Sequence, residues 1–77
     1  MKVNVLGVQD VNFDTPDGKH IEGKNVFCSY NNSYVDGLKT SKIFIGSKFP
    51  VVDSIVPDCD LIIDYNSDGK LENVELL

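Results

Sequence analysis

The fold is decided by the stretch KVNVLGVQDVNFDTPDGKHIEGKNVFCSY, residues 2–30. Its apolar residues alternate with polar ones and do not recur at helical spacing, which is typical of β-strands. Thr15-Pro16-Asp17-Gly18 interrupts the alternation, with proline at the second and glycine at the fourth position of a type I turn. We therefore predict two long strands, residues 2–14 and 21–30, joined by a hairpin.

The alternation also assigns side chains to the two faces of each strand. In the first strand, one face is expected to carry Val3, Val5, Val11 and Phe13, with a bulge at Gly7 or at Gln9-Asp10. In the second strand, Val26, Cys28 and Tyr30 are expected to point one way, and Asn25, Phe27 and Ser29 the other.

Three further strands are expected beyond this hairpin, at residues 38–45, 61–65 and 71–76, the last two joined by a tight turn at Asn66-Ser67-Asp68-Gly69. The prolines Pro50 and Pro57 leave at most a short helical turn around residues 50–56. The predicted fold class is all-β: a small five-stranded antiparallel barrel, OB-like. A small SH3-like barrel and an open five-stranded sheet are the alternatives.

The length of 77 residues corresponds to a single small β domain spanning residues 1–77. No apolar run approaches the roughly 20 residues of a membrane-spanning helix, and the first residues do not resemble an export signal. We therefore expect a cytoplasmic protein that does not contact a membrane, with Cys28 and Cys59 as reduced thiols.

Charge is distributed unevenly along the chain, whose net charge is −5. Residues 19–48 contain five lysines and only two acids, Glu22 and Asp36, which gives a local charge of +3. Residues 53–77 contain seven acids and only one lysine, Lys70, which gives a local charge of −6. The net negative charge argues against a protein that coats duplex DNA by charge alone. The basic middle segment still permits binding of a smaller anionic ligand.

The sequence contains none of the usual patterns for catalysis, a metal or another cofactor, so we predict neither an enzyme nor a cofactor. His20, the only histidine, has no serine or cysteine at a spacing that suggests a catalytic pair. Asp64-Tyr65-Asn66-Ser67-Asp68-Gly69 followed by Glu75 matches the calcium-loop template, but no helix of useful length fits before it. A β-hairpin explains the same residues, and calcium binding stays open.

Aromatic and lysine residues are interleaved along the two central strands, as in grooves that bind single-stranded nucleic acid, where bases stack on rings and lysines follow phosphates. The residues in question are Lys24, Phe27, Tyr30, Tyr34, Lys39, Lys42, Phe44 and Lys48. Phe27 and Phe44 could equally be core residues. The predicted nucleic-acid-binding residues are therefore Lys24, Tyr30, Tyr34, Lys39 and Lys42.

Four segments resemble the helix-destabilising proteins of filamentous phages, a family of small single-stranded-DNA-binding proteins. They are Asn12-Phe13-Asp14, the Pro16-Asp17-Gly18 turn, Val26-Phe27-Cys28-Ser29-Tyr30, and the hairpin from Asp64 to Lys70. The resemblance implies a non-catalytic protein of phage or mobile-element origin, with a homodimer as one oligomeric option. The chain departs from the family in having no arginine and a net negative charge.

A second prediction of a different class uses the acidic segment 53–77. A small acidic protein can act as an inhibitor or adaptor that docks on a basic surface of another protein. The residues expected at that contact are Asp58, Asp60, Asp64 and Asp68.

Overall fold

A computed structural model describes all 77 residues and contains five β-strands and one short 3-10 helix. The strands are β1 (Lys2–Asp14), β2 (His20–Asn31), β3 (Leu38–Gly46), β4 (Asp60–Tyr65) and β5 (Leu71–Leu76), and the 3-10 helix η1 is Pro50–Ser54. The predicted strands, the helical turn and the mainly β class are confirmed, with boundaries that differ by a residue or so. No helix in the structure has the length and apolar character needed to cross a membrane.

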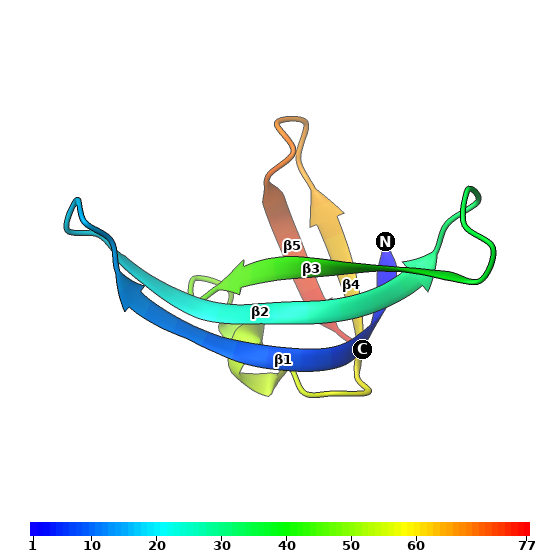
Figure 1. Ribbon diagram of the computed structural model, residues 1–77, viewed down its shortest axis with the longest axis horizontal. Helices are drawn as coiled ribbons and strands as arrows, with labels where there is room; N and C mark the ends of the chain where they lie inside the picture. Colours follow the sequence, from blue (N-terminus) through cyan, green and yellow to red (C-terminus); the bar gives the residue numbers. More distant parts are fainter.

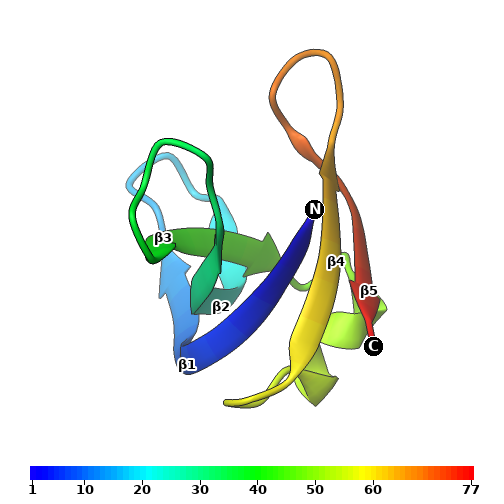
Figure 2. The same cartoon turned by 90° about the vertical axis from the view of Figure 1, so that its right-hand side faces the viewer.

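All five strands pair antiparallel in one sheet, in the order β3-β2-β1-β4-β5. Three consecutive strands lie side by side and the fourth returns beside the first, which is the Greek key arrangement. The sheet is not closed into a barrel, since β3 and β5 are its two free edges. Figures 1 and 2 show β4 and β5 standing behind the curved β1–β2–β3 layer, with β1 shared by both.

The open edge between β3 and β5 corrects the predicted barrel and agrees with the alternative of an open five-stranded sheet. After Gly46 the chain turns away from the sheet through Phe49 into η1, and η1 packs against β5. No backbone pairing joins β3 to β5, and η1 packs beside β5 instead. The Cα radius of gyration, 13.2 Å, exceeds the roughly 11 Å expected for a compact domain of this length, as an open sheet with projecting hairpins requires.

A β-bulge in β1 changes which side chains face the core. Val5 lies opposite Cys28 and Gly7 opposite Phe27, so Leu6 is the extra residue. The bulge lies beside one of the predicted positions, but its effect on the faces was missed. Val3 and Val5 are buried as expected, whereas Phe13 lies on the opposite face, because the extra residue reverses the alternation after Leu6.

The core lies between the inner face of β1–β2–β3, the β4–β5 hairpin and η1. Eleven buried residues form one cluster: Val3, Val5, Val26, Cys28, Ile43, Ile45, Val52, Ile55, Leu61, Ile63 and Val74. The cluster is aliphatic apart from Cys28 and contains no aromatic ring. Both cysteines are free thiols, with Cys28 buried and Cys59 partly buried, and the core thus holds the sheet together without a disulfide.

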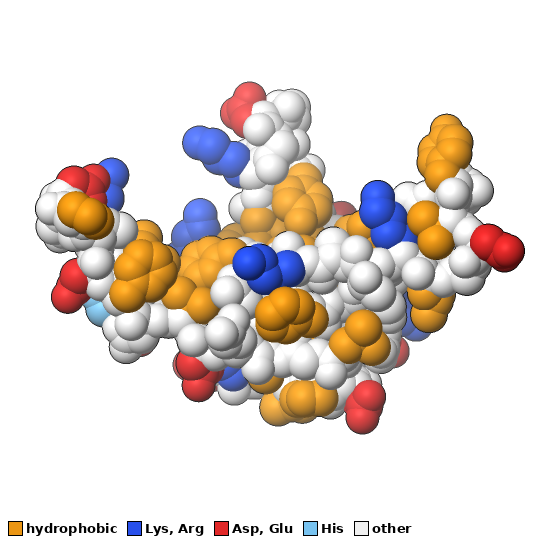
Figure 3. All heavy atoms as spheres, viewed as in Figure 1, with side chains coloured by type: hydrophobic (Ala, Val, Ile, Leu, Met, Phe, Trp, Pro, Cys, Tyr) orange, Lys and Arg blue, Asp and Glu red, His pale blue; other side chains and the backbone are white.

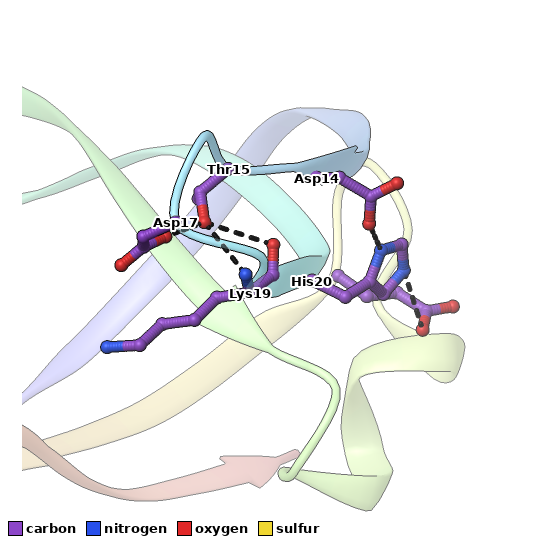
Figure 4. A network of polar contacts seen from close by, with 6 residues as sticks. Asp14, Thr15, Asp17, Lys19 and His20 are labelled. Carbon is purple, nitrogen blue, oxygen red and sulfur yellow. Dashed lines mark hydrogen bonds and ion pairs between the residues drawn. The ribbon is translucent and has the colours of Figure 1, made fainter.

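The hairpin between β1 and β2 is fixed by a compact polar network at its tip (Figure 4). Gly18 N donates to Thr15 O at 3.0 Å, and Lys19 N donates to the Thr15 hydroxyl oxygen at 3.0 Å. Gly18 has a φ of 86°, which favours glycine. His20 Nδ1 lies 2.7 Å from Asp14 Oδ1, a pairing that joins the adjacent strand ends. The predicted turn is confirmed, and His20 lies exposed beside it.

Candidate nucleic-acid interface

The outer face of β1–β2–β3, turned away from the core, carries no acidic residue within the strands. Residues directly opposite one another in an antiparallel pair share a face, so the register assigns its members. They are Asn4, Gly7, Gln9, Val11 and Phe13 of β1, Ile21, Gly23, Asn25, Phe27, Ser29 and Asn31 of β2, and Leu38, Thr40, Lys42, Phe44 and Gly46 of β3. We call these residues the outer face. Lys42 is its only charged member.

Exposed aromatic rings are the main feature of the outer face. Phe27 is 41% exposed, Phe44 42% and Phe13 52%, although phenylalanine is usually buried. Lys42 lies directly opposite Phe27, and its next neighbour on the same face of β3 is Phe44. Figure 3 shows hydrophobic and lysine side chains together over this face, with the acidic groups at its margins. The face is therefore suited to flat, uncharged groups beside an anion.

Gly23 positions the ring of Phe44. A Cβ at Gly23 would lie 2.3 Å from Ile45 O and 2.9 Å from the ζ carbon of Phe44, closer than real contacts allow. Gly46 is also close to this ring, at 3.6 Å from an imagined Cβ to Phe44 Cε2. The ring of Phe44 therefore lies over Gly23 and Gly46, whose missing side chains leave room for it, and part of the ring remains in solvent.

The five predicted nucleic-acid-binding residues do not meet on this face. Only Lys42 belongs to it; Tyr30 and Lys39 are cross-strand partners on the inner face, and Tyr30 packs against the core. Tyr34 lies in the β2–β3 turn and is 95% exposed. Lys24 is on the inner face opposite Asp10, and its Nζ donates to Ile55 O at 3.4 Å. The predicted single surface is thus divided between two faces and two ends of the sheet.

The acidic residues predicted for protein docking spread along β4 and the turns at its two ends. Asp60 accepts a hydrogen bond from Asn4 Nδ2 at 3.1 Å and lies 3.9 Å from Lys2 Nζ. Asp64 accepts from Asn73 Nδ2 at 3.2 Å and lies 3.7 Å from the N-terminal amine. Asp58 and Asp68 lie in the flanking turns. Two of the four carboxylates are therefore already engaged by the chain's own cations and amides.

The segment that matches the calcium-loop template forms the β4–β5 hairpin. Asn66 Oδ1 accepts hydrogen bonds from Asp68 N at 2.9 Å and Lys70 N at 3.0 Å, and Gly69 has a φ of 77°. The side-chain oxygen of Asn66 thus organises the turn itself. No group of three or more His, Cys, Asp or Glu side chains is placed to hold a metal ion.

Tyr65 is an exposed aromatic residue that the sequence reasoning did not select. Burial raises the pKa of its phenol above the ordinary value of 10.0, and nearby Cys28 and Tyr30 raise that pKa further. Tyr65 follows Leu61 and Ile63 at alternate positions of β4, and because both of those residues are buried, Tyr65 lies on the inner side of the open sheet. This alternation is the signal in the sequence that could have selected Tyr65.

The thiol of Cys28 makes stability depend on alkaline pH. Burial raises its pKa above the ordinary value of 9.0, although hydrogen bonding to Ser41 lowers it in part. The unfolded thiol therefore ionises at lower pH than the folded one, and the free energy of unfolding should fall as pH rises above 9.0. Urea unfolding measured across this pH range should show a smaller fall in the free energy of unfolding for Cys28→Ala than for the unmodified chain. The fall that remains in the variant is due to Tyr65. Identical pH dependence in both proteins would contradict this assignment.

The interface consists, then, of a neutral aromatic and amide face crossed by one lysine, with further lysines beyond its margins. Asn4, Gln9, Asn25 and Asn31 place side-chain amides on the same face. Asn4 Nδ2 donates to Asp60 and Asn25 Nδ2 donates to Gln9 Oε1, whereas the Asn31 amide makes no side-chain hydrogen bond within the chain. Comparison with known proteins gives no relative to set beside this arrangement: no protein-family model, no curated protein and no solved structure matches the chain.

Proposed function

We propose that this chain is a non-catalytic binding module for single-stranded nucleic acid, and that bases stack on the outer face. The observation that carries the proposal is the pair of exposed rings, Phe27 and Phe44, on either side of Lys42 on a face without acids. Stacking of a base on an aromatic ring contributes about 1–3 kcal/mol and tolerates any base. Lysine supplies the charge for a phosphate, and the surface amides can reach base edges.

The spacing of the rings favours a single strand over a duplex. Phe27 and Phe44 are diagonal neighbours, because Phe27 faces Lys42 and Phe44 faces Asn25. Side chains in this relation are about 7 Å apart, roughly twice the 3.4 Å rise of stacked bases along one strand. Bases that stack on both rings must therefore be separated from each other, as in an extended strand. In a duplex the ring faces of the bases are covered by their neighbours.

The strand arrangement supports the same ligand. We propose that the sheet is an opened OB-like barrel, since the OB fold is a five-stranded, partly open Greek key barrel. Its oligonucleotides bind across strands 2 and 3 and the loops that follow strands 1 and 4. Here the outer face covers β2 and β3, and those two loops carry Lys19 and Lys70. The resemblance to filamentous-phage helix-destabilising proteins, and with it a phage or mobile-element origin, belongs to the same proposal.

The proposal predicts binding with a weak salt dependence. Titration of a fluorescent oligothymidylate of about 16 nucleotides, the upper site size for one OB fold, should show saturable binding by anisotropy. Because the face holds one lysine and has a few more at its margins, the slope of log K against log salt should be about −1 to −2. A duplex of the same length should bind at least tenfold more weakly. Absence of binding at low salt, or equal binding of the duplex, would refute the proposal.

A further inference from the structure

A pocket of about 460 Å³ opens where the end of β3 faces the start of β5, in the gap that leaves the sheet unclosed. This volume is within the roughly 300–1,000 Å³ of small-molecule sites. Its apolar lining comes from four elements or their flanks: Ile21 of β2, Phe44 of β3, Phe49 before η1, and Leu71 of β5. Phe44 also belongs to the outer face, so the pocket is continuous with the proposed nucleic-acid interface.

Two lysines at the pocket are free to receive an anion. Lys48 and Lys70 both line it, both are exposed, and neither takes part in an ion pair. Lys48 Nζ lies 5.3 Å from the centroid of the Phe49 ring. This cation–π arrangement keeps the ammonium group beside one of the rings that line the pocket. The backbone N–H of Lys70 donates to Asn66 Oδ1 at 3.0 Å, which fixes the start of its side chain.

The other side of the pocket does not cancel this charge. His20 and Glu22 also line it, and His20 Nε2 lies 3.8 Å from Glu22 Oε2. Glu22 is the one acid in the lining against the two lysines, so the lining keeps a formal net charge of +1 with His20 counted as neutral. The pocket thus combines the ring of Phe44, which lies over Gly23 and Gly46, with two ammonium groups that form no ion pair.

We infer that this pocket binds one nucleotide, with the base against Phe44 and the phosphate between Lys48 and Lys70. The choice of ligand rests on the proposed function, because the pocket lies at the end of the face on which the strand would stack. A planar ring that carries a phosphate matches both the apolar wall and the two cations. Such a group can come from the end of a bound strand or from a free mononucleotide.

The first experiment uses thymidine 5′-monophosphate and thymidine as probes. Their binding is monitored by two-dimensional NMR of the labelled protein. We expect the monophosphate to shift amides around Gly46, Phe49 and Lys70 with a Kd near or below about 1 mM. It should bind about tenfold more tightly than thymidine, since it adds charge-assisted hydrogen bonds. Equal affinity of the two probes, shifts located elsewhere, or no shifts would overturn the inference.

Matched variants test the role of the two lysines. The double variant Lys48→Gln/Lys70→Gln should lose the preference for the monophosphate and keep the weak binding of thymidine. Lys39→Gln removes one exposed lysine at the other end of β3 and should leave both affinities unchanged. All these side chains are exposed, and unchanged circular dichroism spectra verify the fold. If Lys39→Gln lowers the affinity as much as the double variant does, general charge is the cause and the inference fails.

Oligothymidylates with and without a 5′-phosphate separate the two sources of the ligand. Tighter binding of the phosphorylated strand, lost in the double variant, identifies a strand end. Monophosphate binding with no such preference identifies a free nucleotide. If the oligonucleotide binds and the monophosphate does not, the pocket inference is wrong and the proposed function stands. If the monophosphate binds and the oligonucleotide does not, the pocket stands and the proposed function is wrong.

Discussion

The double variant Phe27→Ala/Phe44→Ala is expected to bind a single-stranded oligonucleotide at least about 30-fold more weakly than the unmodified chain. Each ring stacks on one base, and a stacked base contributes about 1–3 kcal/mol, so the loss of both rings costs at least about 2 kcal/mol. Because a difference of about 1.4 kcal/mol is tenfold in affinity, the effect is well above experimental error. Anisotropy titration at low ionic strength measures it directly.

The fold should survive this change, because both rings lie outside the core. Neither phenylalanine belongs to the buried cluster, and each has about two fifths of its surface in solvent. Leu38→Ala is the matched control, since it removes an exposed apolar side chain from the same face without removing a ring. Its affinity should stay within about threefold of the unmodified protein. If Leu38→Ala weakens binding as strongly as the double variant, generic apolar contact is the cause and base stacking is not.

Tyr34→Ala distinguishes the outer face from the site expected from the sequence. Tyr34 is almost fully exposed at the β2–β3 turn, away from the two phenylalanines. Stacking on the outer face predicts a small effect for this change. A loss of affinity for Tyr34→Ala that exceeds the loss for the phenylalanine pair would place the interface at the hairpin tip and contradict our proposal.

Gly23→Ala is expected to lower the free energy of unfolding by about 1–3 kcal/mol, as overpacking typically does. The added Cβ would lie 2.3 Å from the carbonyl oxygen of Ile45 and 2.9 Å from the Cα of Gly46. Both are backbone atoms, so β2 and β3 would have to move apart where their pairing ends. Urea unfolding followed by circular dichroism measures the change. The expected change is a large fraction of the total free energy of unfolding for a domain with only one small aliphatic core.

Gly7→Ala is the matched control for this prediction. Nothing lies within 4 Å of a Cβ at Gly7, and this glycine is not among those with positive φ. Alanine there should leave stability unchanged or raise it slightly, because it restricts the unfolded chain. Equal destabilisation by both changes would show that loss of glycine flexibility, and not the close approach at Gly23, is responsible.

The strands and turns were readable from the sequence because each is encoded locally. The Pro16-Asp17-Gly18 and Asn66-Ser67-Asp68-Gly69 turns contain residues that accept their backbone conformations, and the alternation in β2 places Val26 and Cys28 on one face as expected. The closure of the sheet was not readable. It depends on where η1 packs relative to β5, which is a long-range contact that no local pattern specifies.

The candidate site was predicted only in part for a similar reason. Phe27 and Phe44 stood among the interleaved aromatics, but the sequence could not decide between core and surface for them. The register of β2 and β3 places both rings on the face opposite the buried aliphatic residues, such as Val26 and Ile45. Tyr30 was among the predicted nucleic-acid-binding residues, yet its alternation with Val26 and Cys28 directs it inward. The alternation of the strand decides the face of this residue.

The single extra residue in β1 has a consequence for how this chain tolerates insertions and deletions. Loss of Leu6 alone would remove the bulge and leave Val8 inside and Phe13 outside, because Val5 and Gly7 already pair with consecutive residues of β2. A single insertion or deletion elsewhere in the strand, with no bulge to absorb it, would move every side chain on one side of the change to the opposite face. Length variation among descendants of this chain should therefore be tolerated at position 6 and in the hairpin tips, and be rare in the rest of the first strand.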